Sequence, residues 1–451
     1  MGLKMINTLA DCVTFLNGDR GKNYPKQVDF VNGEVPFITA SDLSNNTLSN
    51  KSSYQKKISK DAYVKLRSGK VVKKDILLCL RGSLGKLGVV SDDMTAAIAS
   101  SLVILRPKDQ INSGFLLQWL KSPEFQQILA SYDNGSVQGN LSVKNISTIA
   151  VPNFSPSDQK AIAHILGALD DKIELNQEMN KTLEQITKVI FKSWFVDFDP
   201  VREKVEGHPT CLTPEISSLF PEKFVDSKIG KIPRGWEVLP LNKCGIEIES
   251  GRRPKGGIDK TLDNGIPSVG AESIAPAGEF DFSKVKYVTA EFANKMNKGR
   301  VHPFDVALYK DGGKPGLFIP RVGIYGNKFP FEHFYVNEHV FLLRSRQLGQ
   351  PFLYRLVSSD TFLGQLMFKG SAKAAQPGLN QNEVIESTFV IPSHDVIKEY
   401  NTLVEPLLKH QFLLGKENMI LAELRDALLP KLISGELRIP DAEKFLEEAG
   451  I

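Results

Sequence analysis

Short apolar runs recur through two stretches of the chain, and each run is bounded by Gly, Pro, Asn or Asp. The clearest runs are residues 75–80, 102–105, 305–309 and 340–343. Runs of four to eight apolar residues between turn residues are typical of buried β-strands. Helical segments over 115–130 and 351–368 fit between these strands. The pattern predicts two parts of mixed α and β structure, a first globular part (residues 1–157) and a second globular part (residues 235–392).

Two longer stretches have a helical period instead. Seam residues follow each other at steps of four and three over residues 162–194, and again over residues 400–432. Five heptads of this spacing are typical of a coiled-coil seam, and two such stripes in one chain most simply bury each other. We therefore expect antiparallel spacer helices at 158–196 and 393–436. The seam positions include Leu166, Leu169, Ile173, Asn180, Leu183, Leu407, Leu414, Asn418 and Leu421.

Two asparagines hold equivalent places in the two seams. Antiparallel pairing about a pseudo-two-fold axis is expected to bring Asn180 and Asn418 close together. A buried Asn in a seam costs stability and fixes the register of the helices. The alternative is that both side chains meet solvent at a frayed midpoint.

The chain also repeats itself. Residues 35–43 return as residues 266–274, an offset of 231, and the helical phrase at 183–186 returns at 421–424, an offset of 238. This period is too long for a solenoid, whose units have 20 to 50 residues. It predicts an α+β fold with a pseudo-two-fold internal repeat, in which a linker (197–234) joins the first spacer helix to the second globular part and a C-terminal tail (437–451) ends the chain. Two similar modules suit a ligand with two similar surfaces, and a nucleic-acid duplex is the first candidate.

Composition and charge refine this picture. With 451 residues, 41% hydrophobic and 24% charged, the sequence is that of an ordinary globular protein with more than one core. It has no apolar segment of signal-peptide or membrane-spanning length, so we expect a cytoplasmic location. The first globular part has 19 basic and 12 acidic side chains and the second has 19 and 16, whereas 158–200 and 393–451 are net acidic. This distribution is expected if the globular parts meet phosphates and the helices meet protein.

Motifs for chemistry are missing from the sequence. It contains neither an Asn/Asp-Pro-Pro-Tyr/Phe loop, nor a Gly-x-x-x-x-Gly-Lys-Ser/Thr phosphate loop, nor a His-Glu-x-x-His zinc motif. The glycine-rich stretch 82–88 lies between two strand-like runs, so a turn is predicted rather than a nucleotide cradle. The four cysteines are far apart, and His333 and His339 do not form a recognisable metal motif. We expect no catalytic residue and no metal site.

Duplex binding would require Lys and Arg for phosphates and polar side chains on exposed loops for base edges. Polar glycine-containing loops occur at corresponding places in both globular parts, with a plain solvated loop as the alternative for any one residue. The candidates in the first part are Arg81, Ser83, Lys86, Asn134, Ser136, Gln138 and Asn140. Those in the second part are Arg252, Arg253, Lys310, Lys314, Ser371, Lys373 and Gln376.

Three phrases carry a family resemblance. They are Trp194-Phe195-Val196-Asp197-Phe198-Asp199-Pro200-Val201, Ile232-Pro233-Arg234-Gly235-Trp236 and Leu432-Ile433-Ser434-Gly435-Glu436-Leu437-Arg438-Ile439. With the duplication and both helices, nearly the whole chain resembles the specificity subunits of type I restriction-modification systems. One departure is that the first half lacks the Ile-Pro-x-Gly-Trp lead-in.

The resemblance implies two target recognition domains, each reading one half of a bipartite double-stranded DNA site. It also implies that the helical spacer docks two modification (methyltransferase) subunits, which restriction (translocase and nuclease) subunits then join. S-adenosylmethionine, Mg²⁺ and ATP would belong to those partners, and the chain itself would be non-catalytic. Two alternatives stay open: a stand-alone nuclease or DNA methyltransferase with an unrecognised site, and a protein-interaction scaffold without DNA.

Overall fold

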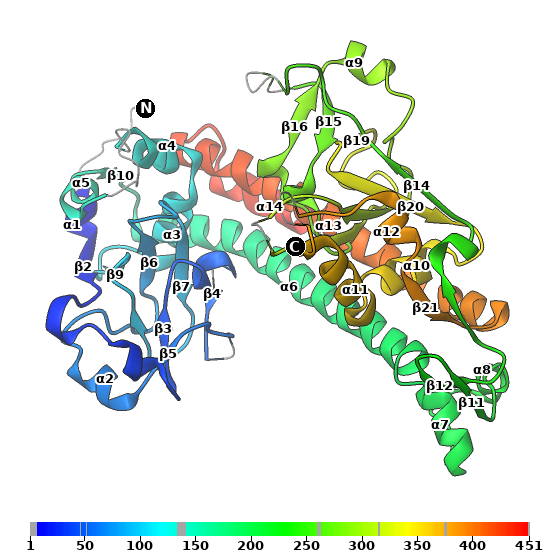
Figure 1. Ribbon diagram of the computed structural model, residues 1–451. Helices are drawn as coiled ribbons and strands as arrows, with labels where there is room; N and C mark the ends of the chain where they lie inside the picture. Colours follow the sequence, from blue (N-terminus) through cyan, green and yellow to red (C-terminus); the bar gives the residue numbers. More distant parts are fainter. Residues whose placement is uncertain are drawn as a thin grey trace. The chain divides into compact units, whose positions relative to one another are not determined.

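The computed structural model describes residues 7–45, 47–50, 52–132, 141–258, 262, 264–313, 316–373 and 377–449 (Figure 1). The chain forms two compact units. Unit 1 comprises Met1–Glu174 and Ile420–Ile451, and unit 2 comprises Leu175–Met419. Two long helices, α6 (Pro156–Phe195) and α13 (His394–Ser434), contribute to both units.

Unit 1 is built on a five-stranded sheet in the order β2-β9-β6-β7-β4. Its strands are β2 (Val13–Asn17), β9 (Leu102–Pro107), β6 (Ile76–Cys79), β7 (Leu87–Val90) and β4 (Thr47–Leu48). All four residues of β6 are buried, because this strand is central and both faces of the sheet are covered, which explains its unbroken apolar sequence. A smaller sheet has the order β5 (Lys57–Ile58), β3 (Val35–Ile38), β8 (Ala97–Ile98), and β1 (Asn7–Thr8) pairs with β10 (Ala150–Val151).

Unit 2 contains a four-stranded sheet in the order β14-β20-β17-β18. Its strands are β14 (Ile246–Ser250), β20 (Val340–Ser345), β17 (Val306–Tyr309) and β18 (Val322–Ile324). A smaller sheet has the order β16 (Lys286–Val288), β15 (Ile266–Val269), β19 (Tyr335–Val336). Two antiparallel pairs complete the described strands of unit 2. They are the hairpin of β11 (Phe224–Ser227) with β12 (Gly230–Pro233), and the pair of β13 (Glu237–Pro240) with β21 (Thr388–Ile391), which are far apart in sequence.

The internal repeat is confirmed by sheet topology. The order β2-β9-β6-β7 of unit 1 returns as β14-β20-β17-β18 in unit 2. The two smaller sheets also match, since each combines one antiparallel and one parallel pair around its central strand. Even the register is repeated, because Asn17 lies opposite Val103 and Ser250 lies opposite Phe341, each at the end of its strand pair. The mixed α and β content expected from the apolar runs is therefore present in both globular parts.

Short helices lie between the strands. Unit 1 has α1 (Leu9–Cys12), α2 (Lys60–Lys65), α3 (Ser113–Lys121), α4 (Pro123–Ser131), α5 (Val143–Ser147) and α14 (Ile439–Ala449). Unit 2 has α7 (Asp199–Glu206), α8 (Pro214–Ser218), α9 (Ala290–Asn294), α10 (Gln350–Val357), α11 (Asp360–Ser371) and α12 (Gln381–Ile385). Single 3₁₀ turns are η1 (Gly21–Asn23), η2 (Gln27–Phe30), η3 (Asp42–Asn45), η4 (Leu241–Lys243), η5 (Ala271–Ser273) and η6 (Phe282–Lys284).

The helical segments predicted over 115–130 and 351–368 are confirmed, but each is divided into two helices, α3 and α4 in the first and α10 and α11 in the second. Ser122 ends α3 and caps α4, its hydroxyl accepting from the N–H of Phe125, with Pro123 as the first residue of α4. Ser359 plays the same part for α11, accepting from the N–H of Phe362. A capping serine interrupts the helix because it supplies the acceptor that a new helix start requires.

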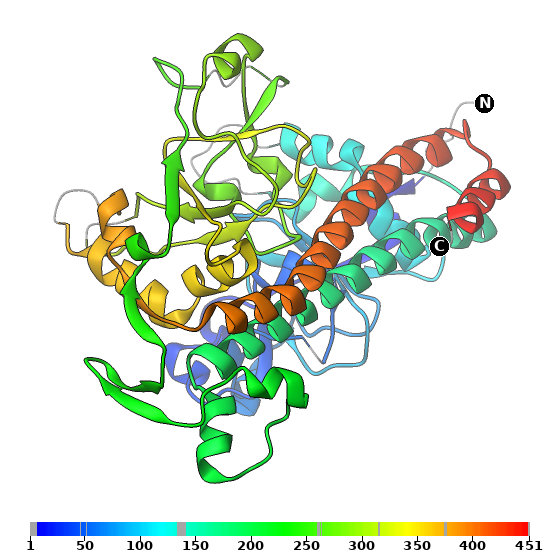
Figure 2. The same cartoon turned by 90° about the vertical axis from the view of Figure 1, so that its right-hand side faces the viewer.

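The long helices pack against each other in antiparallel fashion within each unit. In unit 1 the Arg425 guanidinium of α13 donates to Asp170 of α6 at 2.8 Å. Figure 2 shows α6 and α13 side by side. In unit 2, Gln411 of α13 donates to the carbonyl of Asn180 at 3.3 Å, and the Tyr400 hydroxyl donates to the carbonyl of Thr187 at 3.4 Å. Buried seam residues are Leu166, Leu169, Asn180, Leu414 and Leu421, and half-buried ones are Ile173, Leu183, Leu407 and Asn418.

The asparagine pairing differs from the expectation. Asn180 is buried, and its amide nitrogen donates to the carbonyl of Ala277 at 2.9 Å. Its neighbour on α13 is Gln411, which lies seven residues before Asn418 and hence roughly two helical turns from it. The heptad period fixes which face of a helix is buried but not its axial register, so Asn180 and Asn418 do not pair.

Three of the cysteines are buried, Cys211 is exposed, and all four are free thiols. Among the described residues, no helix combines the length and apolar character that crossing a membrane demands.

Candidate nucleic-acid interface

The glycine-rich stretch of the first globular part is a turn between β6 and β7, as predicted. Gly82 (φ 83°) and Gly85 (φ 79°) take the left-handed conformation that the turn requires. Arg81, Ser83 and Lys86 are all exposed on it. The turn thus offers two cationic groups and a hydroxyl to a ligand at this edge of the sheet. Asn134, Ser136, Gln138 and Asn140 lie outside the described residues, as do Lys314 and Gln376 of the second part.

In the second globular part, the structure places Arg252 and Arg253 on an exposed segment after β14. The Arg253 Nε is 3.0 Å from a carboxylate oxygen of Glu338, so part of its charge is already balanced. Lys310 is half-buried at the end of β17, with its amino group 5.0 Å above the ring of Phe341. The second part therefore carries fewer uncompensated charges than its sequence suggests.

Two further candidates are held by intramolecular contacts. The Ser371 hydroxyl accepts from the N–H of Phe318 at 2.9 Å. The Lys373 amino group donates to the carbonyl of Gly378 at 2.8 Å and to Glu383 at 2.7 Å. These contacts give both side chains a structural role at the end of α11.

A cavity of about 460 Å³ lies beside the turn in the first part. Its polar lining residues include Asn17, Asp19, Arg20, Ser68, Arg81, Ser100 and Ser142. Arg20 is exposed, and one of its terminal nitrogens donates to the carbonyl of Ser100 at 3.4 Å. Arg20 is not among the candidates predicted from the sequence. Arg20 is the structural equivalent of Arg253. This equivalence follows from the strand register, which is not visible in the sequence.

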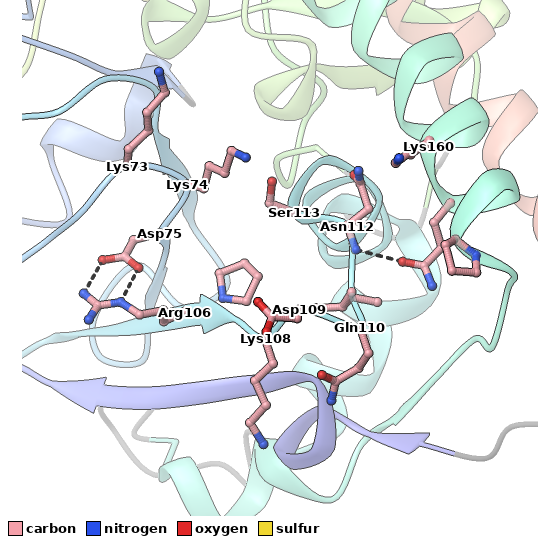
Figure 3. Close-up of a pocket in the computed structure, with 14 residues that line it drawn as sticks. Lys73, Lys74, Asp75, Arg106, Lys108, Asp109, Gln110, Asn112, Ser113 and Lys160 are labelled. Carbon is pink, nitrogen blue, oxygen red and sulfur yellow. Dashed lines mark hydrogen bonds and ion pairs between the residues drawn. The ribbon is translucent and has the colours of Figure 1, made fainter.

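A second, strongly basic pocket of about 370 Å³ lies at the other end of β6 (Figure 3). Lys73, Lys74 and Lys160 line it, and Figure 3 shows the amino group of Lys74 directed towards Ser113 at the start of α3. Arg106 is committed to Asp75, whose hydrogen bonds raise the pKa of the guanidinium. The amino group of Lys108 donates to the carbonyl of Ala10 at 2.8 Å. The three remaining lysines and the Ser113 hydroxyl are suited to an anion such as a phosphate group. No local sequence pattern indicates these residues, because they come from three separate segments.

Groups for metal chemistry do not gather in the part of the chain that the structure describes, where no three His, Cys, Asp or Glu side chains are placed to share an ion. The His339 ring lies between two carboxylates, at 2.5 Å from Asp311 and 3.2 Å from Glu338. The candidate residues of the preceding paragraphs instead form exposed cationic and polar loops, which can bind an anionic polymer.

Comparison with known proteins gives this surface its context. Residues 5–185 match the family model of the type I restriction modification DNA specificity domain. The MjaIX specificity subunit of Methanocaldococcus jannaschii is 27% identical over 421 residues, covering 92% of this chain and 89% of the relative. The HindI specificity subunit of Haemophilus influenzae is 24% identical, covering 95% of this chain and all of the relative. Over most of its length the chain is similar to type I restriction-modification specificity subunits.

This confirms the resemblance carried by residues 194–201, 232–236 and 432–439. The family model covers residues 5–185, and the strand order of unit 1 is repeated in unit 2. Among solved structures, a type I S subunit from M. genitalium is similar over 94% of this chain and 95% of its own, with 14% identity and a TM-score of 0.49.

Proposed function

We propose that this specificity subunit reads a bipartite DNA target, one half-site with each globular part. The observation that carries the proposal is the repeated strand order and register, because two equal frames can present unlike loops to two unlike half-sites. Phosphate contacts would position each frame, and polar loop residues would read base edges. Methylation mapping across the host genome tests this: two fixed half-sites with a constant gap are expected, and a single continuous site would contradict it.

The long helices would set the gap between the half-sites. With 40 and 41 residues, α6 and α13 are each roughly 60 Å long. Their antiparallel contacts in each unit support a rigid spacer. Inserting seven residues into both helices at facing positions should lengthen the recognised gap by about 3 base pairs, from 1.5 Å per helical residue and 3.4 Å per base pair. Methylation mapping of this variant measures the gap, and an unchanged gap would refute the spacer role.

The helices also offer a surface to partner subunits. In unit 2, exposed apolar side chains follow α6 at steps of four, seven and three, and similar ones lie on α13. They are Leu175, Met179, Ile186 and Val189 on α6, with Leu403 and Leu413 on α13. The His410 ring lies 3.3 Å from the Met179 sulfur, which places the two stripes on the same side. Val189 and Leu413 are the most exposed members of this row, both at 63%, and several exposed apolar side chains gathered on one surface are typical of a protein interaction site.

We assign this apolar stripe to the docking of two modification subunits, which restriction subunits would then join. Val189→Ser with Leu413→Ser should abolish co-purification of the modification subunit while leaving the fold intact. Val64→Ser on α2 is a matched control, because Val64 is also an exposed valine on a helix, 72% exposed. Unchanged co-purification of the double variant would place the docking surface elsewhere.

The chain would carry no chemistry of its own. Its relatives are named specificity subunits, and S-adenosylmethionine, Mg²⁺ and ATP would be held by the partners. The modification subunits would flip an adenine in each half-site, since chemistry on a base requires its removal from the stack. The purified chain incubated with target DNA, S-adenosylmethionine, Mg²⁺ and ATP should transfer no methyl group and cut no strand. Turnover by the chain alone would favour a stand-alone enzyme, and failure to bind any duplex would favour a protein scaffold.

A further inference from the structure

The two globular parts place an arginine at the same point of the repeated frame. Asn17 ends β2 opposite the second residue of β9, and Ser250 ends β14 opposite the second residue of β20. Arg20 and Arg253 each follow these strand ends by three residues. Strand register therefore makes Arg20 and Arg253 structural equivalents.

Equivalent glycines determine the direction of the chain after β2 and after β14. Gly18 and Gly251 follow the strand ends, and Gly69 and Gly299 pack on them, both with φ of 81°. A Cβ on Gly69 would lie 3.0 Å from the Gly18 Cα, and one on Gly299 would lie 2.4 Å from the Gly251 Cα. Backbones this close leave no room for side chains, so both segments are guided in the same direction towards their arginines.

Each arginine contacts the equivalent segment of its own globular part. Arg20 donates to the carbonyl of Ser100, two residues after β8, and Arg253 contacts Glu338, two residues after β19. Cavities of about 460 and 550 Å³ open beside Arg20 and Arg253, respectively. Both arginines are exposed, so they can reach a ligand at the rim of the cavity.

The polar side chains around the arginines differ between the two parts. Asp19 corresponds to Arg252, one residue before each arginine. Arg81, two residues after β6, corresponds to Asp311, two residues after β17. Ser100 corresponds to Glu338. The arginine is thus the cationic group that both rims share among otherwise unlike neighbours. Two half-sites of different sequence have the phosphate backbone in common, whereas their base edges differ.

We propose that Arg20 and Arg253 contact equivalent backbone phosphates in the two half-sites. The different side chains beside them determine which bases each globular part reads. The inference rests on the proposed DNA-reading function and adds to it the phosphate-contacting residues. Arg20 contributes more than Arg253, because Arg20 donates to a neutral carbonyl and Arg253 is paired with a carboxylate that a phosphate would have to displace.

The test is a binding titration of the full chain by fluorescence anisotropy over a range of KCl concentrations. One labelled duplex carries the target found by methylation mapping, and a second carries scrambled half-sites. Arg20→Ala should raise the Kd for both duplexes by roughly five- to tenfold and lower the salt slope by about one, as the loss of one phosphate contact does. Arg20→Lys should keep the salt slope, because the charge remains.

A matched control separates this effect from a change in total charge. Lys65 is an exposed cation on α2 of the same globular part, and Lys65→Ala should leave Kd and salt slope close to wild type. An Arg20→Ala chain that binds both duplexes like wild type would overturn the proposal, as would a loss confined to the target duplex, which indicates a base contact. Wild-type protein that does not prefer the target duplex would instead overturn the proposed DNA-reading function.

Discussion

The two globular parts share a buried polar framework. In the first, the Arg106 guanidinium is bound by both oxygens of Asp75 at 2.8 Å, and it also donates to the carbonyl of Lys70. In the second, Arg344 makes the same set of contacts with Asp305 and the carbonyl of Arg300. The duplication has preserved an interior ion pair because removing one partner from such a pair would leave a buried charge.

The parts differ where they meet the long helices. The sixth residue of α3 is Gln118, which with Lys121 donates to Asp170 of α6 at 2.7 Å. The sixth residue of α10 is Arg355, which binds Glu184 of α6 through both terminal nitrogens. Arg355 is 1% exposed, whereas the Lys121 side chain is 14% and the Arg425 side chain 21% exposed. The comparison shows that one frame can be joined to a helix by a buried or by a partly solvated ion pair.

The largest expected effect comes from breaking the buried pair. Glu184→Ala should reduce the free energy of unfolding of unit 2 by about 3–5 kcal/mol, because it leaves the Arg355 charge buried without its partner. Asp170→Ala is the matched change in unit 1 and should cost less, since Lys121 and Arg425 can turn to solvent. Urea denaturation followed by tryptophan fluorescence measures both. Equal losses of unfolding free energy in the two variants would contradict the distinction. The double change Glu184→Leu with Arg355→Met should recover most of the stability, because it removes both buried charges.

The same pair predicts a pH dependence. Burial raises the pKa of Glu184, but the hydrogen bonds and charge of Arg355 outweigh burial and hold this pKa below its usual value. A lowered folded-state pKa contributes stability that is present above the unfolded pKa of about 4.3 and is lost as pH falls through the folded pKa. Unfolding midpoints measured from pH 6 downwards should therefore fall more steeply below pH 4 in wild type than in Glu184→Gln. Parallel curves would contradict this.

The features that local patterns determine were predictable from the sequence. The strands at 75–80, 102–105, 305–309 and 340–343, the turn within 82–88 and the repeat follow from apolar runs and turn residues, which act over short distances. The Glu184–Arg355 pair, whose members are 171 residues apart, was not predictable, and neither was the equivalence of Arg20 with Arg253, which needs strand register. The Asn180–Asn418 pairing failed for a related reason, since a heptad pattern does not specify the axial register of two helices.

Intermediate effects are expected from the glycines that end β2 and β14. A Cβ on Gly251 would lie 1.5 Å from the carbonyl oxygen of Val336, and one on Gly18 would lie 2.6 Å from that of Ala99. Both contacts are with backbone, so Gly251→Ala and Gly18→Ala should cost about 1–3 kcal/mol, with Gly251→Ala the more costly. Gly167→Ala in α6 is the control: nothing lies within 4 Å of its Cβ, and it should stabilise by roughly 0.5–1 kcal/mol. Thermal denaturation ranks the three, and a reversed order of Gly18 and Gly251 would contradict the comparison.

The smallest expected effect distinguishes the two arginines. Glu338 balances Arg253, and its Oε2 is buried with no hydrogen-bond partner. Glu338→Gln removes this negative charge while keeping the size of the side chain, so Arg253 becomes available to a phosphate. The variant should bind duplex DNA about two- to fivefold more tightly at low salt, with the gain disappearing as added salt screens the charges. Adding Arg253→Ala to Glu338→Gln should cancel the gain, whereas adding Lys65→Ala should not. If the gain persists in the Arg253→Ala background, Glu338 repels DNA directly. The two globular parts would then differ in surface charge and not in the contact that each arginine makes within the protein.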